Sequence, residues 1–245
     1  MLGRFHELSI PTRDIRASVE FYERLGFTQA QTGEVWTHPY GVLTDGRVAL
    51  GLHQHPGRGT ALTFVHPQIA EHSVELERRG MRFAYRRIGA DMFHEIGVLG
   101  PDGELLVVLE TRTYSPSDRS EREPSRLGEF RELTLPAADL EVARTFWEPL
   151  GFVSVGESRE PYPRLALTSD HLNLAFHPRR MLASPLLVFG GESVRAPSER
   201  LRDLGIETSS ALPRELDPRR NALIEAPEGT LLLVTEDPQA SGASP

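Results

Sequence analysis

The sequence predicts an α+β fold in which one βαβββ module occurs four times, twice in each of two tandem halves. Two self-matches support this prediction. Residues 5–27, FHELSIPTRDIRASVEFYERLGF, align without a gap with residues 130–152, FRELTLPAADLEVARTFWEPLGF, and are identical at 10 of 23 positions. The ends of the halves match as well, as PDGELLVVLE at 101–110 and PEGTLLLVTE at 227–236. A repeat of this length indicates an internal duplication, so the two halves should share one fold.

The first module, residues 5–55, begins with a strand and a helix. Residues 5–10 alternate between apolar and polar side chains, which is typical of a half-buried strand. Asp14 can cap the helix that follows, and Gly26 can end it. Three strand-like runs separated by turn residues complete the module, namely FTQAQT, YGVLTDG and RVALGLHQ.

The second module, residues 60–110, repeats this order. TALTFV is predicted to form a strand, QIAEHSVELERRG a helix that ends at Gly80, and strands should follow near MRFAYRR, FHEIGVL and ELLVVLE. Residues 130–236 should contain the same elements, although the sequence pattern that predicts them is weaker there. We align the middles of the halves through a shared His-Pro pair, at 55–56 and 177–178.

The segments outside the modules differ in composition. Residues 111–129 are rich in Ser, Arg, Glu and Pro and should form a linker, and residues 237–245 should form a disordered tail. The predicted domains are therefore residues 1–110 and residues 130–236.

Composition excludes several classes of function. The formal net charge of −8 argues against nucleic acid or an anionic membrane as the main partner. The chain has neither cysteine nor lysine, so thiolate and Schiff-base chemistry are excluded. No phosphate-binding glycine loop or nucleophile elbow is found. No apolar run could span a bilayer, and strand-like pattern begins at Phe5, so we expect a cytoplasmic location.

The strand that runs into a capping Asp, the FYERLGF helix end and the closing PDGELLVVLE run resemble the vicinal oxygen chelate superfamily, which comprises glyoxalases, bleomycin-resistance proteins and extradiol dioxygenases. The resemblance covers nearly the whole chain. It implies two tandem cupped-sheet domains of the glyoxalase/bleomycin-resistance type, with helices outside and a ligand in the cup. It also implies, for enzymes of the group, one divalent metal held by His and Glu. Because the superfamily spans isomerases, dioxygenases and drug-binding proteins, whether this protein is an enzyme stays open.

Strand parity tests the implied metal site. Leu8 and Ile10 should pack against the helix, which places Phe5, Glu7 and Ser9 in the cup and His6 on the other face. The family ligand usually stands seven residues before the capping Asp, which is Glu7 here and Glu132 in the second half. The remaining family positions carry no metal-binding side chain; they fall at Gly51, Ala61, Val107 and, in the second half, Leu233. Since one carboxylate does not hold a transition metal, we expect no metal cofactor.

An alternative keeps one divalent metal at a relocated site. His53 and His55 share one face of their strand, and Glu7 could lie across the cup from them. Such a site would indicate a metal-dependent lyase, isomerase or dioxygenase. The simpler interpretation of the two histidines is a strand end that runs into a turn.

The first half holds most of the candidate ligand-binding side chains. An inward Glu7 or Glu132 is costly to bury alone, so each should bind a ligand, act as a base, or pair with an inward arginine. Aromatic residues and histidines nearby suit a small, partly apolar molecule, and the predicted binding set is Glu7, Trp36, His53, His55, Tyr85, Phe93 and His94, with His38 and Tyr40 close by. The leading interpretation is a metal-independent binding protein that resembles the bleomycin-resistance branch. The second half, with PLLVFGG and TLLLVTE, looks like a structural partner, so we expect a monomeric pseudo-dimer or a homodimer.

Overall fold

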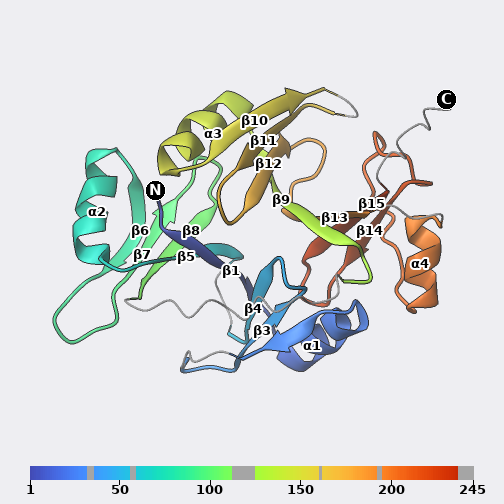
Figure 1. Ribbon diagram of the computed structural model, residues 1–245, viewed down its shortest axis with the longest axis horizontal. Helices are drawn as coiled ribbons and strands as arrows, with labels where there is room; N and C mark the ends of the chain where they lie inside the picture. Colours follow the sequence, from blue (N-terminus) through green and yellow to red (C-terminus); the bar gives the residue numbers. More distant parts are fainter. Residues whose placement is uncertain (32–35, 56–58, 112–124, 160–161, 192–194, 237–245) are drawn as a thin grey trace, which may run out of the picture.

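The computed structural model describes most of the chain, which folds into two sheets with helices packed outside them (Figure 1). The described residues are 1–31, 36–55, 59–111, 125–159, 162–191 and 195–236. The tail predicted at 237–245 and most of the predicted linker, residues 112–124, lie outside this set. Within the described residues no helix is long and apolar enough to cross a membrane.

The first half forms an eight-stranded sheet from two modules (Figure 1). Module one comprises β1 (Arg4–Pro11), α1 (Ile15–Arg24), β2 (Thr28–Ala30), β3 (Tyr40–Thr44) and β4 (Ala49–His53). Module two comprises β5 (Ala61–His66), α2 (Ile69–Arg78), β6 (Arg82–Arg87), β7 (Glu95–Leu99) and β8 (Leu105–Glu110). The strand order is β2-β3-β4-β1-β5-β8-β7-β6, so antiparallel pairing of β1 with β5 joins the modules.

The second half forms a seven-stranded sheet in the order β10-β11-β12-β9-β13-β15-β14. Its first module comprises β9 (Glu129–Ala137), α3 (Leu140–Trp147), the short helix η1 (Glu148–Leu150), β10 (Val153–Ser158), β11 (Arg164–Thr168) and β12 (Asn173–Pro178). Its second comprises β13 (Leu186–Gly191), α4 (Pro197–Asp203), β14 (Asn221–Glu225) and β15 (Leu231–Glu236). The predicted α+β fold of two cupped sheets is confirmed, although the last module has two strands after its helix, because residues 206–220 form turns instead.

The predicted helix caps are present. The Asp14 side chain accepts a hydrogen bond from the backbone N–H of Ala17 at the start of α1, and Asp139 caps α3 in the same way. Leu8 and Ile10 are buried in the main apolar core, as parity predicts. This core includes side chains of both halves.

A bulge in β1 corrects one parity prediction. The pairing with β5 shifts between Phe5 and Glu7, so Phe5 packs edge-on against the core residue Phe64, with ring centroids 5.6 Å apart, rather than in the cup. Glu7 keeps its predicted orientation. The pairing of β9 with β13 shifts at the equivalent place, so the bulge belongs to both halves.

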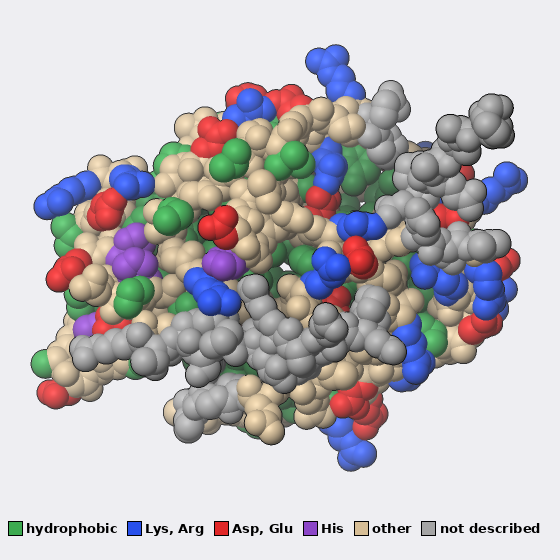
Figure 2. Space-filling view, viewed as in Figure 1, with side chains coloured by type: hydrophobic (Ala, Val, Ile, Leu, Met, Phe, Trp, Pro, Cys, Tyr) green, Lys and Arg blue, Asp and Glu red, His purple; other side chains and the backbone are tan. Residues whose placement is uncertain are grey.

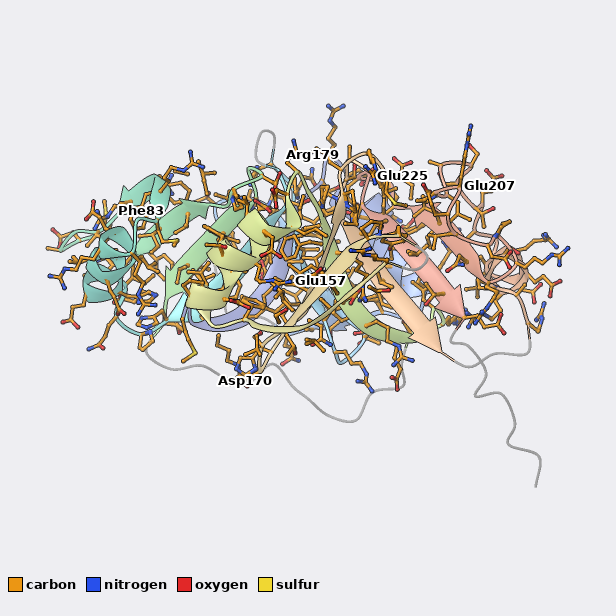
Figure 3. All side chains as sticks on the ribbon, turned by 90° about the horizontal axis from the view of Figure 1, so that it is seen from above. Phe83, Glu157, Asp170, Arg179, Glu207 and Glu225 are labelled. Carbon is orange, nitrogen blue, oxygen red and sulfur yellow. The ribbon has the colours of Figure 1, made fainter. Side chains whose placement is uncertain are left out.

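The acidic residue of each closing PDG or PEG turn binds the opposite half. Glu228 accepts hydrogen bonds of 2.7 Å from the hydroxyls of Tyr22 and Ser18 on α1. Asp102 accepts from the backbone N–H of Ala138 at 2.9 Å and from Arg179 at 3.0 Å. Figure 3 shows the resulting elongated molecule, with Phe83 towards one end and Glu207 towards the other. The repeated motif therefore contributes reciprocal contacts between the halves.

Candidate functional site

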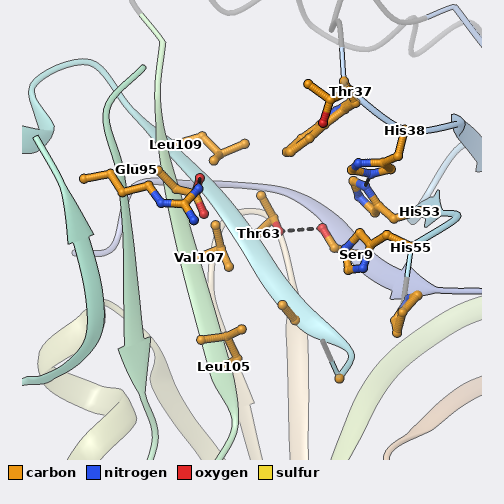
Figure 4. Close-up of a pocket in the computed structure, with 15 residues that line it drawn as sticks. Ser9, Thr37, His38, His53, His55, Thr63, Glu95, Leu105, Val107 and Leu109 are labelled. Atoms are coloured by element: carbon orange, nitrogen blue, oxygen red, sulfur yellow. Dashed lines mark hydrogen bonds and ion pairs between the residues drawn. The ribbon is translucent and has the colours of Figure 1, made fainter. Parts of the chain in front are cut away.

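The cup of the first sheet contains a cavity of about 420 Å³. Strands β1, β4, β5, β6, β7 and β8 and the segment before β3 contribute its walls (Figure 4). Its apolar lining is Pro11, Trp36, Gly59, Ala61, Leu105, Val107 and Leu109, and its polar lining is Ser9, Thr37, His38, His53, His55, Thr63, Arg87 and Glu95. Visible histidine side chains in Figure 2 also gather over this half of the molecule.

Glu7 lies behind the cavity wall and is 1% exposed. Its carboxylate accepts hydrogen bonds from the hydroxyls of Ser9 at 2.8 Å and Tyr40 at 2.6 Å, and lies 3.1 Å from Nε2 of His53. A Cβ atom added at Gly51 would overlap this carboxylate. Gly51 therefore makes the room in which Glu7 reaches Tyr40 and His53.

A second histidine extends this network towards the cavity. Nδ1 of His53 lies 3.0 Å from Nε2 of His38, so the two rings and Glu7 form one hydrogen-bonded chain. Trp36 packs edge-on against His53, with centroids 4.9 Å apart. Burial lowers the pKa of His38, and the neighbouring His53 and His55 lower it further. His38 is therefore neutral at physiological pH.

The opposite wall carries an arginine and a carboxylate. Figure 4 shows Glu95 across the cavity from His38 and His53, with Val107 and Leu109 between them. Glu95 accepts a hydrogen bond from the Tyr85 hydroxyl, and Arg87 lies 3.5 Å from its other oxygen. A polar group thus stands at each side of an apolar floor.

Only some of the predicted binding residues line the cavity. Trp36, His53 and His55 line the cavity, whereas Glu7 supports His53 from behind. Tyr85 does not line the cavity itself, but its hydroxyl donates a hydrogen bond to the lining residue Glu95. The remaining two lie away from the lining: Phe93 is 61% exposed, and His94 contacts Glu110 at 2.8 Å and the carbonyl of Gly89 at 2.9 Å.

Five polar lining residues were not predicted as binding residues, and one of them is Thr37 in the segment before β3. Parity places Ser9 in the cup, but Ser9 was not among the predicted binding residues. Thr63 lies opposite Glu7 in the pairing of β5 with β1, so its side chain is on the same face of the sheet as that of Glu7. Arg87 and Glu95 pair with each other across β6 and β7. Pairing the MRFAYRR and FHEIGVL runs as neighbouring strands could have identified Arg87 and Glu95 from the sequence, because opposite charges are favourable at facing positions of two strands.

The cup does not fit the metal that the family resemblance implies. Ala61 and Val107 line the cavity at the expected family positions, and Gly51 lies beneath Glu7, so none of the three offers a donor. Throughout the part of the chain that the structure describes, no group of three or more His, Asp or Glu side chains could hold a metal ion. Both ring nitrogens of His53 have protein partners. The lack of a metal cofactor stays a prediction.

The equivalent cup of the second half is built differently. Glu132 forms an ion pair with Arg164, whose Nε lies 3.1 Å from the carboxylate. An apolar cluster covers this face of the sheet, formed by Leu186, Val188, Leu216, Leu223, Leu231 and Leu233 with Tyr162, Leu182 and Leu212 against it. Leu212 and Leu216 come from the turns that replace the missing strand. The predicted pairing of a buried glutamate with an inward arginine therefore holds for Glu132.

Strand register corrects the alignment of the two middles. Pro11 pairs with His53 in the first half, and the equivalent Pro136 pairs with His177 in the second. His177 therefore corresponds to His53, and the alignment through the two His-Pro pairs is wrong. Its Nε2 binds the carbonyl of Leu182 at 3.0 Å, and its Nδ1 lies 3.1 Å from the Thr134 hydroxyl.

The cupped sheets define the class of fold. Neither a protein-family model nor a curated protein sequence matches the chain. Solved structures with matching folds include dioxygenases and a glyoxalase, so the chain has the fold of the vicinal oxygen chelate proteins, as the sequence predicted.

Three solved structures illustrate this similarity. The 2,3-dioxygenase LapB from Pseudomonas sp. KL28 is 12% identical with a TM-score of 0.64, over 98% of this chain and 94% of that one. A catechol 2,3-dioxygenase is 14% identical with a TM-score of 0.60, over 98% and 90%. The Mn(II)-bound glyoxalase from Novosphingobium aromaticivorans is 14% identical with a TM-score of 0.59, over 96% and 82%. At these identities the similarity establishes the fold alone.

Proposed function

We propose that this protein binds a small, partly apolar molecule in the cup of its first half, without the divalent metal that the family resemblance implies. The observation that carries the proposal is the cavity of about 420 Å³, which has an apolar floor between two polar walls. This volume falls within the range of known small-molecule sites, roughly 300–1,000 Å³. The second cup carries an apolar cluster instead.

The polar groups of the first cup are held in place before any ligand binds. Ser9 and Thr63 share a hydrogen bond of 2.6 Å, and the Glu7 carboxylate fixes His53. Fixed polar groups lower the entropic cost of binding. The names of the solved structures give further support, since catechol and homoprotocatechuate are small molecules.

A thermal-shift screen against metabolites and aromatic antibiotics tests this proposal. We expect at least one compound to raise the melting temperature of the wild-type protein. Ala61→Leu should abolish that increase, because it puts into the first cup the residue that the second cup carries at the equivalent position, Leu186. An exposed substitution far from the cup, Val155→Ala, should leave the increase unchanged.

Metal content provides the other half of the test. Protein purified without chelator should contain no stoichiometric Fe, Mn, Zn or Ni, and chelators should leave the ligand-induced shift unchanged. Stoichiometric metal that is lost in Glu7→Gln and His53→Gln would instead support the relocated metal site. A compound that stabilises Ala61→Leu as strongly as the wild type would show that the cup is not the binding site.

A further inference from the structure

The chain of hydrogen bonds from Glu7 through His53 to His38 ends in the proposed binding cavity. We propose that His38 is a metal-independent base, which removes a proton from a weakly acidic hydroxyl of the bound molecule, and that Glu7 and His53 are positioning residues that hold it in its basic form. This inference rests on the proposed function, because it needs a small molecule in the first cup.

Hydrogen-bond chemistry fixes the tautomer of each ring. A carboxylate can only accept, so Glu7 requires that Nε2 of His53 carry its hydrogen. The proposal requires a neutral His53, whose Nδ1 is then an acceptor, so that Nε2 of His38 donates to it across 3.0 Å. A neutral imidazole carries one hydrogen, so Nδ1 of His38 is left with a free lone pair.

The surroundings of His38 keep this lone pair available. Among the described residues, the one hydrogen bond that His38 makes is to His53. The ring lines the cavity, and its lowered pKa keeps it neutral. The titratable side chains that face it are His53 and His55, with Arg87 and Glu95 on the opposite wall.

The proton transfer is balanced within the chain. The ligand hydroxyl gives its proton to Nδ1 of His38 and keeps the electron pair as an oxyanion. The hydrogen on Nε2 of His38 can then move to Nδ1 of His53, which becomes an imidazolium ion beside the Glu7 carboxylate. The positive charge ends next to a buried negative charge, which favours the deprotonated ligand by Coulomb attraction.

The cavity selects the class of molecule. Ala61, Val107 and Leu109 form an apolar floor, and Trp36 lies beside the histidines, so the ligand should have a flat, conjugated frame. A conjugated frame also delocalises the charge of an oxyanion. The inferred ligand is therefore a flat molecule with a weakly acidic hydroxyl at the histidine wall.

The second half contains a natural control for this inference. His177 occupies the position of His53, but its nitrogens bind Thr134 and a backbone carbonyl, so no second histidine continues the chain. A buried histidine with a purely structural role would, like His177, only form hydrogen bonds with neighbouring protein groups. The proposal requires that His53 and His38 respond together to changes at Glu7, while His177 does not respond.

Proton–nitrogen correlation NMR of isotope-labelled protein tests the chain without any ligand. At neutral pH we expect His38 and His53 to carry hydrogen on Nε2, with Nδ1 of His38 unprotonated. Glu7→Gln should mix the tautomers of both rings, because the amide can donate as well as accept, while the signals of His177 stay unchanged. A wild-type His38 with hydrogen on Nδ1, or a doubly protonated ring at neutral pH, would overturn the proposal.

The dye para-nitrophenol tests the proton transfer, because its phenolate absorbs visible light and its phenol does not. Binding is measured separately by equilibrium dialysis. Wild-type protein should convert bound dye to phenolate at a pH where free dye is mostly neutral, and His38→Gln should bind the dye but lose the colour. His171→Gln, which removes an exposed histidine of the second half, should behave like the wild type.

The outcomes separate this inference from the proposed function. If other screened compounds bind the cup but para-nitrophenol does not, or binds without ionising, the inference fails and the proposed function stands. If the tautomers are as expected but no compound stabilises the protein, the proposed function fails, and the proton-transfer site fails with it.

Discussion

The two halves of the chain carry an equivalent inward-facing glutamate and surround it differently. Glu7 binds hydroxyl groups and a histidine, whereas Glu132 forms an ion pair with Arg164. Strand register shows that Arg164 occupies the position of Tyr40. One residue at the start of the third strand therefore decides whether the carboxylate is held by hydroxyl groups and a histidine or pairs with an arginine.

The residues that shape each cup differ in the same direction. Strand register places five residues of the first cup at the positions of larger or more apolar residues in the second: Gly51 corresponds to Ala175, Ala61 to Leu186, Thr63 to Val188, Gly97 to Leu223, and Val107 to Leu233. These changes add volume or remove a hydroxyl. The second cup is consequently covered by its own side chains, and the first keeps a cavity.

Gly51→Ala should have the largest effect on this difference. The added Cβ would overlap the Glu7 carboxylate and force it away from Tyr40 and His53. Overpacking and the loss of hydrogen bonds to a buried charge together should lower the free energy of unfolding by about 3–4 kcal/mol, measured by urea denaturation. The matched change in the second half, Ala175→Gly, should cost at most about 1 kcal/mol. Equal effects of the two changes would show that the glycine is not specific to the Glu7 network.

Arg164→Met should have the next largest effect. It leaves the mostly buried Glu132 without its cation, while Met retains much of the side-chain volume. Because the arginine is partly exposed, we expect a loss of about 1–3 kcal/mol, less than for a fully buried pair. Arg131→Met, at a half-exposed arginine on β9 beside Glu129, should stay within about 0.5 kcal/mol in the same urea titration. A loss no larger than that of the control would mean that the Glu132 ion pair is not structural.

Tyr40→Phe makes the corresponding change in the first half. It removes the hydroxyl that donates to Glu7 at 2.6 Å and keeps the ring that contacts His53. A hydrogen bond to a charged group contributes about 1.5–3 kcal/mol, and Ser9 and His53 still bind the carboxylate, so we expect a loss of about 1–2 kcal/mol. Tyr162→Phe in the second half tests the general effect of losing a tyrosine hydroxyl and should change stability by less than about 0.5 kcal/mol. Differential scanning calorimetry of both variants would check the difference.

The sequence predicted the repeat, the caps and the orientation of Glu7 because these depend on local pattern. Periodicity and the capping Asp14 are readable from a few neighbouring residues. The bulge between Phe5 and Glu7 was not predicted, since an extra residue in a strand depends on how the partner strand pairs. The missing strand at 206–220 had no signal that distinguished turns from an edge strand.

The site was only partly predictable for a similar reason. Glu7 and His53 were identified, but their direct contact depends on the register of β1 against β4 and on the space above Gly51. The correspondence of His53 with His177 was missed because the His-Pro pairs gave a plausible alignment that is shifted by two residues. Contacts across strands require register, which a single sequence specifies weakly.

The smallest expected effect is a pH dependence that arises from the second cup. Burial raises the pKa of Glu132, and the charge of Arg164 opposes this increase. A carboxyl whose pKa is higher in the folded state contributes stability that is fully present below its unfolded pKa and is lost as the pH rises through the folded pKa. Glu132→Gln should remove this loss and raise the free energy of unfolding at neutral pH by up to about 1 kcal/mol.

Urea titrations at pH values below and above the normal range of a glutamate pKa would check this expectation. Wild-type protein should lose more stability than Glu132→Gln between the two conditions. Glu7→Gln should instead lower stability at neutral pH, because Gly51, Ser9 and Tyr40 shape a site for a charged acceptor rather than for an amide donor. If both variants gained stability at neutral pH, the two glutamates would affect stability in the same way. The difference between the cups would then not include their carboxylates.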